Sequence, residues 1–219
     1  MNKYNGFIIN LDRRENRLIN AMDTLKKTNI NIKRYSAIDG LKITIDDELK
    51  KRINPWNLNK KNISNENKLR GILGCCLSHL NLWNKISKME DEYVFVFEDD
   101  LCFANSNIDF NKEWTKINNI LPEDFGLLWL NNPHKFKKTN DISKNKIIKT
   151  TETRTTEAYI IKPSFAKELH NFINNNLGAV DAHMGQYSNF LYKKNKNIFY
   201  KLMNGIFCQT SKFKSDIQN

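Results

Sequence analysis

The sequence lacks the features that would place the protein in a membrane or an oxidising compartment. No apolar run reaches the roughly 20 residues of a membrane-spanning helix, and Met1–Gly6 enters a short strand without the apolar stretch of a signal peptide. We therefore expect a soluble cytoplasmic protein. The sequence also has no C-x-x-C pair. Its cysteines lie in apolar contexts and are expected to be reduced core residues, not zinc ligands. They are Cys75, Cys76, Cys102 and Cys208.

Nucleic-acid-binding signatures are also missing, although the chain is strongly basic. The formal net charge is +11, from 35 Lys and Arg residues against 24 Asp and Glu residues. The positive charge is spread over loops such as Asn59–Asn62 and Lys193–Asn197, without a basic helix, an aromatic platform or zinc-finger spacing. We expect no nucleic-acid partner. An anionic small molecule, or peripheral contact with an anionic membrane, is compatible with this charge.

Apolar runs of strand length alternate with stretches of helical periodicity. Strands are expected at 6–11, 32–37, 93–97, 125–130, 157–161, 198–202 and 206–208, and helices from residue 12, at 71–88 and at 163–172. Residues 41–70 and 132–151 are polar variable loops, the first with short helices. At 219 residues, the chain is predicted to form a single α/β domain over 1–219, with a mostly parallel central sheet flanked by helices.

An acidic cluster follows the most apolar of these strands. Tyr93–Phe97 runs directly into Glu98, Asp99 and Asp100. Ligands bind outside the carboxyl ends of the strands in open α/β sheets, and neighbouring carboxylates commonly share a cation there. Oxygen ligands of this kind suit Mg²⁺ or Mn²⁺. The alternative is a strand that ends in a solvated acidic turn.

Four segments in order resemble the signature of glycosyltransferase family 25, which includes lipooligosaccharide and collagen galactosyltransferases. They are Asn10–Arg17, Ala37–Gly40, Gly74–Leu80 and Phe97–Asp100. Glu157–Ile161, Val180–Asp181 and Gln209 are similar to later elements of the family, so the resemblance covers nearly the whole chain. It departs from the family at Ile72–Leu73, where an acidic residue is common.

The resemblance implies a GT-A-like domain that transfers a hexose, galactose or glucose, from a UDP-sugar with inversion. Such a reaction uses Mn²⁺ or Mg²⁺ at the diphosphate and a carboxylate as general base. Glu98 and Asp100 would form the D-x-D-like metal element, with Asp99 as a second ligand or helper and His183 completing the site. The alternative for His183 is a polar surface residue or one that is satisfied by another hydrogen-bond partner. Strand alternation would place Glu98 and Asp100 on one side and Asp99 on the other. Asp181 is the candidate base, and the alternative for Asp181 is a helix N-cap.

The same resemblance implies a donor-binding set around the nucleotide. Arg13 and Arg17 at the start of the first helix suit phosphate. Asp12 is either the N-cap of that helix or a ribose or base contact. Asp39 is either a uracil or ribose contact or part of an ordinary Asp-Gly turn. Ser78 and His79 contact the donor or lock a nearby loop. The full donor set is Asn10, Asp12, Arg13, Arg17, Asp39, Ser78, His79, Glu98 and Asp99.

Three kinds of acceptor agree with the resemblance: a glycan, a lipid-linked saccharide or a hydroxylysine side chain. A catalytically inactive carbohydrate- or nucleotide-binding module is the alternative function. A metal-dependent phosphohydrolase or nuclease would also use acidic strand ends, but it predicts further His and Asp ligand motifs, which the chain lacks.

Overall fold

The computed structural model describes residues 4–59, 65–131, 146–152 and 155–213. Within them, a seven-stranded sheet has the strand order β2-β1-β3-β7-β5-β8-β6. Its strands are β1 (Tyr4–Asn10), β2 (Ile30–Ser36), β3 (Val94–Glu98), β5 (Leu127–Trp129), β6 (Ile147–Lys149), β7 (Ala158–Ile161) and β8 (Phe199–Leu202). A second, two-stranded sheet pairs β4 (Leu101–Phe103) with β9 (Phe207–Gln209).

Most strands of the large sheet run in one direction. The pairs β2–β1, β1–β3 and β5–β8 are parallel, whereas β7 is antiparallel to both of its neighbours and β6 is antiparallel to β8. The predicted α/β class, with a mostly parallel central sheet flanked by helices, is confirmed.

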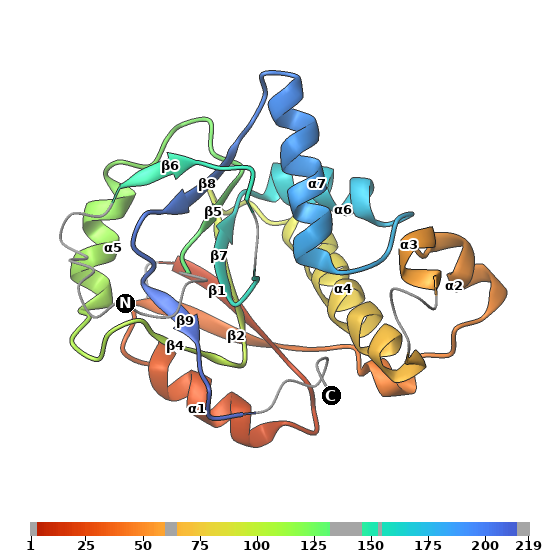
Figure 1. Cartoon of the computed structure of the whole chain (residues 1–219). Helices are drawn as coiled ribbons and strands as arrows, with labels where there is room; N and C mark the ends of the chain where they lie inside the picture. The colour runs from red at the N-terminus through yellow and green to blue at the C-terminus, as the bar shows by residue number, and fades with distance from the viewer. Residues whose placement is uncertain (1–3, 60–64, 132–145, 153–154, 214–219) are drawn as a thin grey trace.

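Alternating side chains divide the interior into two cores, one on each face of the sheet. On β3, Val94 and Val96 belong to one core, whereas Phe95 and Phe97 belong to the other. The first core contains buried residues of α4 (Glu66–Ile86), α6 (Pro163–Ile173) and α7 (Val180–Lys193). Figure 1 shows these three helices together on one side of the sheet.

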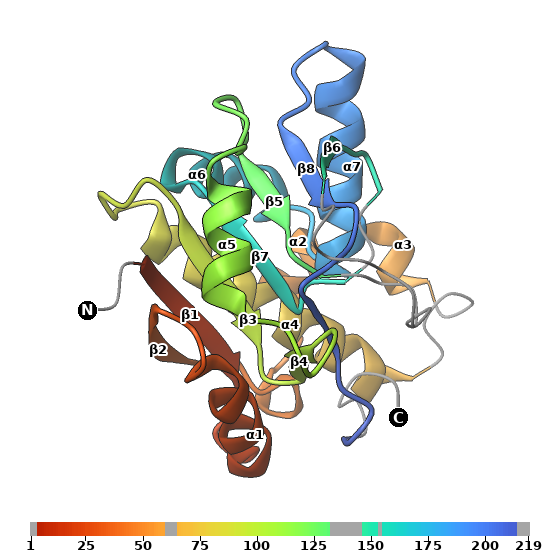
Figure 2. The same cartoon turned by 90° about the vertical axis from the view of Figure 1, so that its left-hand side faces the viewer.

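The opposite face is covered by α1 (Glu15–Leu25) and α5 (Phe110–Asn118). Figure 2 shows α5 in front of the sheet and α1 below it. Trp114 of α5 is buried against Phe95, with ring centroids 4.9 Å apart. An aromatic pair at this distance adds about 1 kcal/mol beyond the burial of its area.

Short helices follow the second strand. These are η1 (Gly40–Lys42), α2 (Asp47–Arg52) and α3 (Pro55–Leu58), and α2 and α3 lie beyond α4 in Figure 1. They confirm the short helices predicted within 41–70, although α4 begins inside that segment, at Glu66. Residues 60–64 and 132–145 of the two predicted variable loops lie outside the described residues.

The structure corrects three local predictions. The first helix begins at Glu15, not at Asp12, because residues 11–14 form a turn in which Arg14 N donates to Leu11 O at 2.9 Å. Residues 147–149 form β6 within a segment predicted to be a loop, because they pair with β8. Helix α5 and strand β4 lie in a region for which no element was predicted.

The parallel strands β1 and β3 bring two polar residues to one edge of the sheet. Ile9 pairs with Glu98, and Asn10 pairs with Ser36 at the end of β2. The loop after β2 is joined to the same edge, since Ala37 N donates to Asn10 O at 2.9 Å. The carboxyl ends of β1, β2 and β3 therefore meet where the sequence predicts a binding site.

Candidate donor and metal site

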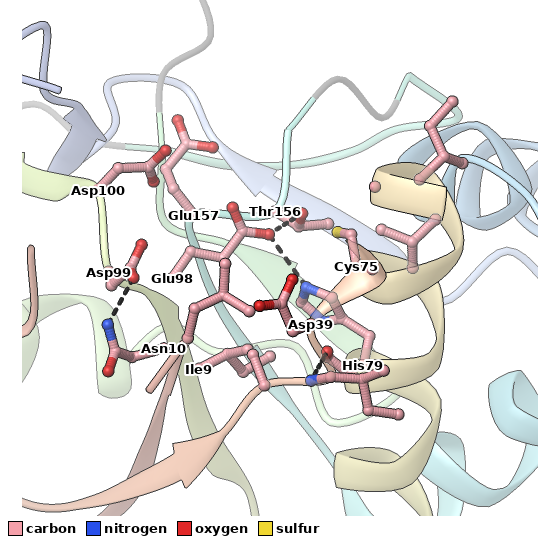
Figure 3. A pocket seen from close by; sticks show the side chains of 18 of the residues that line it. Ile9, Asn10, Asp39, Cys75, His79, Glu98, Asp99, Asp100, Thr156 and Glu157 are labelled. Carbon is pink, nitrogen blue, oxygen red and sulfur yellow. Dashed lines mark hydrogen bonds and ion pairs between the residues drawn. The ribbon is translucent and has the colours of Figure 1, made fainter. Parts of the chain in front are cut away.

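A cavity of about 300 Å³ lies at this edge of the sheet. Its walls come from the ends of β1 and β3, the loop at 37–41, the inner face of α4, the first turn of α7, residues 155–157 and Gln209. A volume of this size is at the lower end of small-molecule sites in proteins. Figure 3 shows the carboxylates of Glu98, Asp99, Asp100 and Glu157 gathered at this cavity.

Arg17 joins the two aspartates of the acidic turn. Its guanidinium lies 2.7 Å from Asp99 Oδ1 and 3.0 Å from Asp100 Oδ2, and all three residues are buried. Asn10 Nδ2 donates to Asp99 Oδ2 at 2.7 Å (Figure 3). Strand β3 ends at Glu98. The alternation predicted for the three acids therefore does not continue past Glu98, and Asp99 and Asp100 both contact Arg17.

Asp100 has one satisfied and one unsatisfied carboxylate oxygen. Gln209 Nε2 donates to Asp100 Oδ2 at 2.8 Å, whereas Asp100 Oδ1 is buried and has no hydrogen-bond partner among the described residues. Burial, followed by the nearby charge of Glu98, raises the pKa of Asp100 to about 7. A buried oxygen without a hydrogen-bond partner lowers the stability of the fold unless a ligand binds to it. Asp100 Oδ1 is therefore suited to bind a cation.

A chain of hydrogen bonds holds Glu98 in place. Trp83 Nε1 donates to the Tyr159 hydroxyl at 2.9 Å, and that hydroxyl is also hydrogen-bonded to His79 Nδ1 at 2.9 Å. His79 Nε2 donates to Glu98 Oε1 at 3.0 Å, because an ionised carboxylate can only accept a hydrogen bond. The Thr156 hydroxyl donates to the same oxygen (Figure 3).

These contacts keep Glu98 charged. Burial raises the pKa of Glu98, but the hydrogen bonds from His79 and Thr156, together with the electrostatic attraction of His79 and Arg17, outweigh that effect, and the net shift of the pKa is downward. Glu98 and Asp100 are thus neighbouring carboxylates with opposite pKa shifts, a pattern common at functional sites.

The loop after β2 is fixed by α4 and by Arg13. Ser78 Oγ accepts from Ile38 N at 2.8 Å and donates to Gly74 O at 2.6 Å. Asp39 caps η1 by accepting from Leu41 N, and its other oxygen lies 2.9 Å from Arg13 Nε. The predicted loop-locking contact of Ser78 is confirmed. Asp39 therefore does take part in the turn that was the alternative prediction for it. It also lines the cavity.

Asp181 lines the cavity from the first turn of α7. The N-cap of α7 is Ala179, so the N-cap interpretation of Asp181 is wrong. Asp181 Oδ1 instead accepts from Ala182 N at 2.8 Å. Burial raises the pKa of Asp181; the bond from Ala182 opposes this shift and the charge of Glu98 adds to it.

Two predicted residues lie apart from the cavity lining. Asp12 is not the N-cap of α1, which is Arg14, and its exposed carboxylate pairs instead with Arg34 and Ser36. His183 is buried, its Nδ1 lies 3.1 Å from Gln186 Oε1, and its Nε2 lies beside Gly178. The described residues that line the cavity include neither of them. The structure therefore does not bring His183 together with Glu98 and Asp100.

Sequence reasoning missed Glu157, Thr156 and Cys75 as cavity residues. Glu157 is 2% exposed, and burial raises its pKa. Glu98 N donates to Glu157 O at 3.0 Å, which places these two residues side by side. The sequence did contain a signal for Glu157, because its carboxylate directly precedes an apolar strand, whereas Glu98 ends one.

Cys75, His79 and Glu98 form a second candidate ligand group. One ligand atom from each lies within 4.8 Å of the others. Burial, with a smaller effect from Glu98, raises the pKa of the Cys75 thiol well above its usual range. The thiol is therefore protonated, and His79 already donates to Glu98, so this group is a weaker cation site than the one at Asp100.

Segments of known galactosyltransferases are similar to this chain. Procollagen galactosyltransferase 2 of Mus musculus is 31% identical over 104 residues, which are 45% of this chain and 16% of the mouse protein. The protein of the same name from Homo sapiens is 31% identical over 111 residues, 51% of this chain and 17% of the human protein. The matches thus cover less than a fifth of the length of either relative.

A solved structure of a Drosophila β-1,4-galactosyltransferase 7, in complex with manganese, UDP-Gal and xylobiose, is distantly similar. It has a TM-score of 0.45 and 11% sequence identity, and the match covers 99% of this chain and 71% of that one. This similarity is too low to support an argument about the fold, which is described from the strand order of this chain.

The family model gives the broadest match. The model described as Glycosyltransferase family 25 (LPS biosynthesis protein) matches residues 3–184. That range contains the acidic turn, the loop at Asp39 and the start of α7 at Asp181, all of which line the cavity. Since the match spans most of the sequence, this chain belongs to glycosyltransferase family 25.

Proposed function

We propose that this chain is a nucleotide-sugar-dependent hexosyltransferase that takes galactose or glucose from a UDP-sugar with inversion. The observation that carries the proposal is the cavity in which Glu98, Asp100 and Asp181 come together from β3, the turn after it and α7. The acceptor is a glycan, a lipid-linked saccharide or a hydroxylysine side chain. Membership of glycosyltransferase family 25 supports this class of reaction.

The residues at Asp100 fit a divalent cation such as Mn²⁺ or Mg²⁺. Asp100 offers a buried oxygen without a partner, and Glu98 offers a second carboxylate that is held charged. These two residues would hold the cation, which when bound neutralises the charge of the leaving diphosphate. His183 is left out of this proposed set because of its position beside Gly178.

The nucleotide is proposed to bind between the loop at 37–41 and the start of α1. Arg13 is partly exposed at the cavity, and its pairing with Asp39 fixes both side chains there. Arg17 is already engaged by Asp99 and Asp100. We therefore assign phosphate contact to Arg13 and the positioning of the acidic turn to Arg17.

Asp181 is proposed as the general base that takes the proton from the acceptor hydroxyl. It lies on the α7 side of the cavity, and its bond from Ala182 N orients the carboxylate. Burial raises its pKa, which makes the carboxylate a stronger base than a solvated aspartate.

Calorimetric titration of UDP, UDP-galactose and UDP-glucose, with Mn²⁺ and with chelator, tests the donor site. We expect Mn²⁺-dependent binding in the parent protein and its loss in Asp100→Asn. The matched control is Asp23→Asn, because Asp23 is an exposed carboxylate on the outer face of α1. Equal UDP affinity with and without Mn²⁺ in the parent would rule out the metal site. Absence of binding to all three ligands would favour the inactive module.

Asp181→Asn separates binding from transfer. The asparagine oxygen can still accept from Ala182 N, so we expect donor affinity close to that of the parent. Transfer should fall by about 10²-fold or more, because the base is lost. The measurement is release of UDP with a panel of acceptors, beside a titration of the donor. Transfer at the parental rate would refute the assignment of Asp181 as base.

A further inference from the structure

Two cysteines face each other across the small sheet beside the acidic turn. Cys102 of β4 is directly opposite Cys208 of β9 in the antiparallel register, and their Sγ atoms lie 3.0 Å apart. Both side chains are partly exposed, so a small reagent can reach them. Cys76, in contrast, is fully buried on α4.

The backbone around this pair suits a disulfide. Ala104 N donates to Ile206 O, and Thr210 N donates to Asp100 O, so Cys102 and Cys208 occupy a hydrogen-bonded position of the ladder. Cα atoms of such a pair lie about 5.5 Å apart. A disulfide requires roughly 4.4–6.8 Å between Cα atoms, and a pair in this register falls within that range.

We propose that Cys102 and Cys208 are a reversible redox site, whose disulfide locks β9 onto β4 at the rim of the cavity. Asp100 precedes β4 directly, and Gln209, next to Cys208, donates to Asp100 Oδ2 at 2.8 Å. The lock therefore fixes Gln209 on Asp100. Formation of the Cys102–Cys208 disulfide does not depend on the proposed function. Only the effect of the disulfide on donor binding rests on that function.

The oxidant is a low-molecular-weight disulfide such as oxidised glutathione. The thiolate of Cys102 attacks one glutathione sulfur, forms a mixed disulfide and releases one glutathione thiolate. The thiolate of Cys208 then attacks Cys102 Sγ in the mixed disulfide, forms the Cys102–Cys208 bond and releases the second glutathione thiolate. The protein loses two protons and two electrons, and both glutathiones leave reduced.

Peptide mapping tests whether the bond forms. The full chain is equilibrated with graded ratios of oxidised to reduced glutathione, alkylated and digested with trypsin. We expect peptides 89–112 and 202–212 to become linked, and peptide 71–85, with Cys75 and Cys76, to remain doubly alkylated. Added reduced glutathione should reverse the link. Separate alkylation or separate glutathionylation of Cys102 and Cys208 at every ratio would overturn the proposal.

A second measurement tests the lock itself. Hydrogen exchange of peptide 202–212 should slow by about tenfold or more in the oxidised protein, because β9 can no longer separate from β4. The melting temperature should rise by roughly 5 °C or more. Cys102→Ser is the matched control and should show neither change under the same oxidation. Linked peptides without slower exchange would refute the locking of β9.

Discussion

Glu98 is positioned by a hydrogen-bond chain that begins at two residues outside the cavity lining, Trp83 and Tyr159. The chain from Trp83 through Tyr159 to His79 fixes the orientation of the imidazole, and the imidazole fixes the carboxylate. Tyr159 and Trp83 are both fully buried. A carboxylate held in this way presents its second oxygen in one orientation, which lowers the cost of binding a ligand there.

Tyr159→Phe tests this chain. The change leaves Trp83 Nε1 and His79 Nδ1 without their common partner, so the free energy of unfolding should fall by about 1–3 kcal/mol. Donor affinity should weaken as well, since Glu98 loses its fixed orientation. Urea denaturation gives the first quantity and calorimetry the second. Tyr192→Phe is the control, since Tyr192 is 62% exposed. Equal losses in both variants would contradict the prediction.

At the scale of elements, the site depends on a close approach of α4 to the loop after β2. Gly74 on α4 leaves no room for a side chain: an added Cβ would lie 2.8 Å from Gly40 N and 2.8 Å from Ile38 O. The same contact brings Ser78 to Ile38 N. Helix packing thus decides where Asp39 stands relative to the acidic turn.

Gly74→Ala should therefore damage both stability and donor binding. Overpacking against backbone atoms that cannot rotate away should cost about 1–3 kcal/mol of unfolding free energy, although alanine favours the helix. Thermal melting with and without UDP measures both effects. Asn81→Ala, at an exposed position of the same helix, should be neutral or slightly stabilising. A melting temperature of Gly74→Ala at or above that of the parent would contradict the close-packing argument.

At the scale of the whole molecule, the formal net charge of +11 predicts a positive long-range field, although the cavity itself is lined by carboxylates. A long-range field attracts an anionic nucleotide and is screened by salt, whereas buried pairs such as Arg17 with Asp99 are screened much less. The charge is therefore expected to act on the rate of encounter more than on the fold.

No helix among the described residues has the length and apolar character to cross a membrane.

Salt dependence of UDP binding measures this field. Raising the ionic strength from about 0.1 M to about 1 M shortens the Debye length from roughly 10 Å to 3 Å. The association rate of UDP in stopped flow should fall by about threefold to tenfold. Uridine, which carries no phosphate, is the control and should associate at nearly the same rate in both buffers. An equal decrease for both ligands would show that the field has no such role.

The sequence alone determined the α/β class and the edge of the sheet where the cavity lies. Tyr93–Phe97 has the apolar composition of a buried strand, and Glu98 to Asp100 follow it directly. The order of residues in this one segment was therefore sufficient to predict the acidic end of the strand. Helix α5 was also predictable from the sequence, because Phe110, Trp114 and Ile117 recur at helical spacing. Strand β6 was not predictable, because three partly exposed residues become a strand only by pairing with β8.

Only the tertiary structure decided which side chains meet at that edge. Strand β7 is antiparallel to β3, so its beginning brings Thr156 and Glu157 beside Glu98 from a distant part of the chain. Arg17 of α1 reaches Asp99 and Asp100, which follow β3 more than 80 residues later in the chain. His183 turns away from the cavity although Asp181, on the same turn of α7, lines it. Such contacts depend on strand direction and helix phase, which no local pattern of residues specifies.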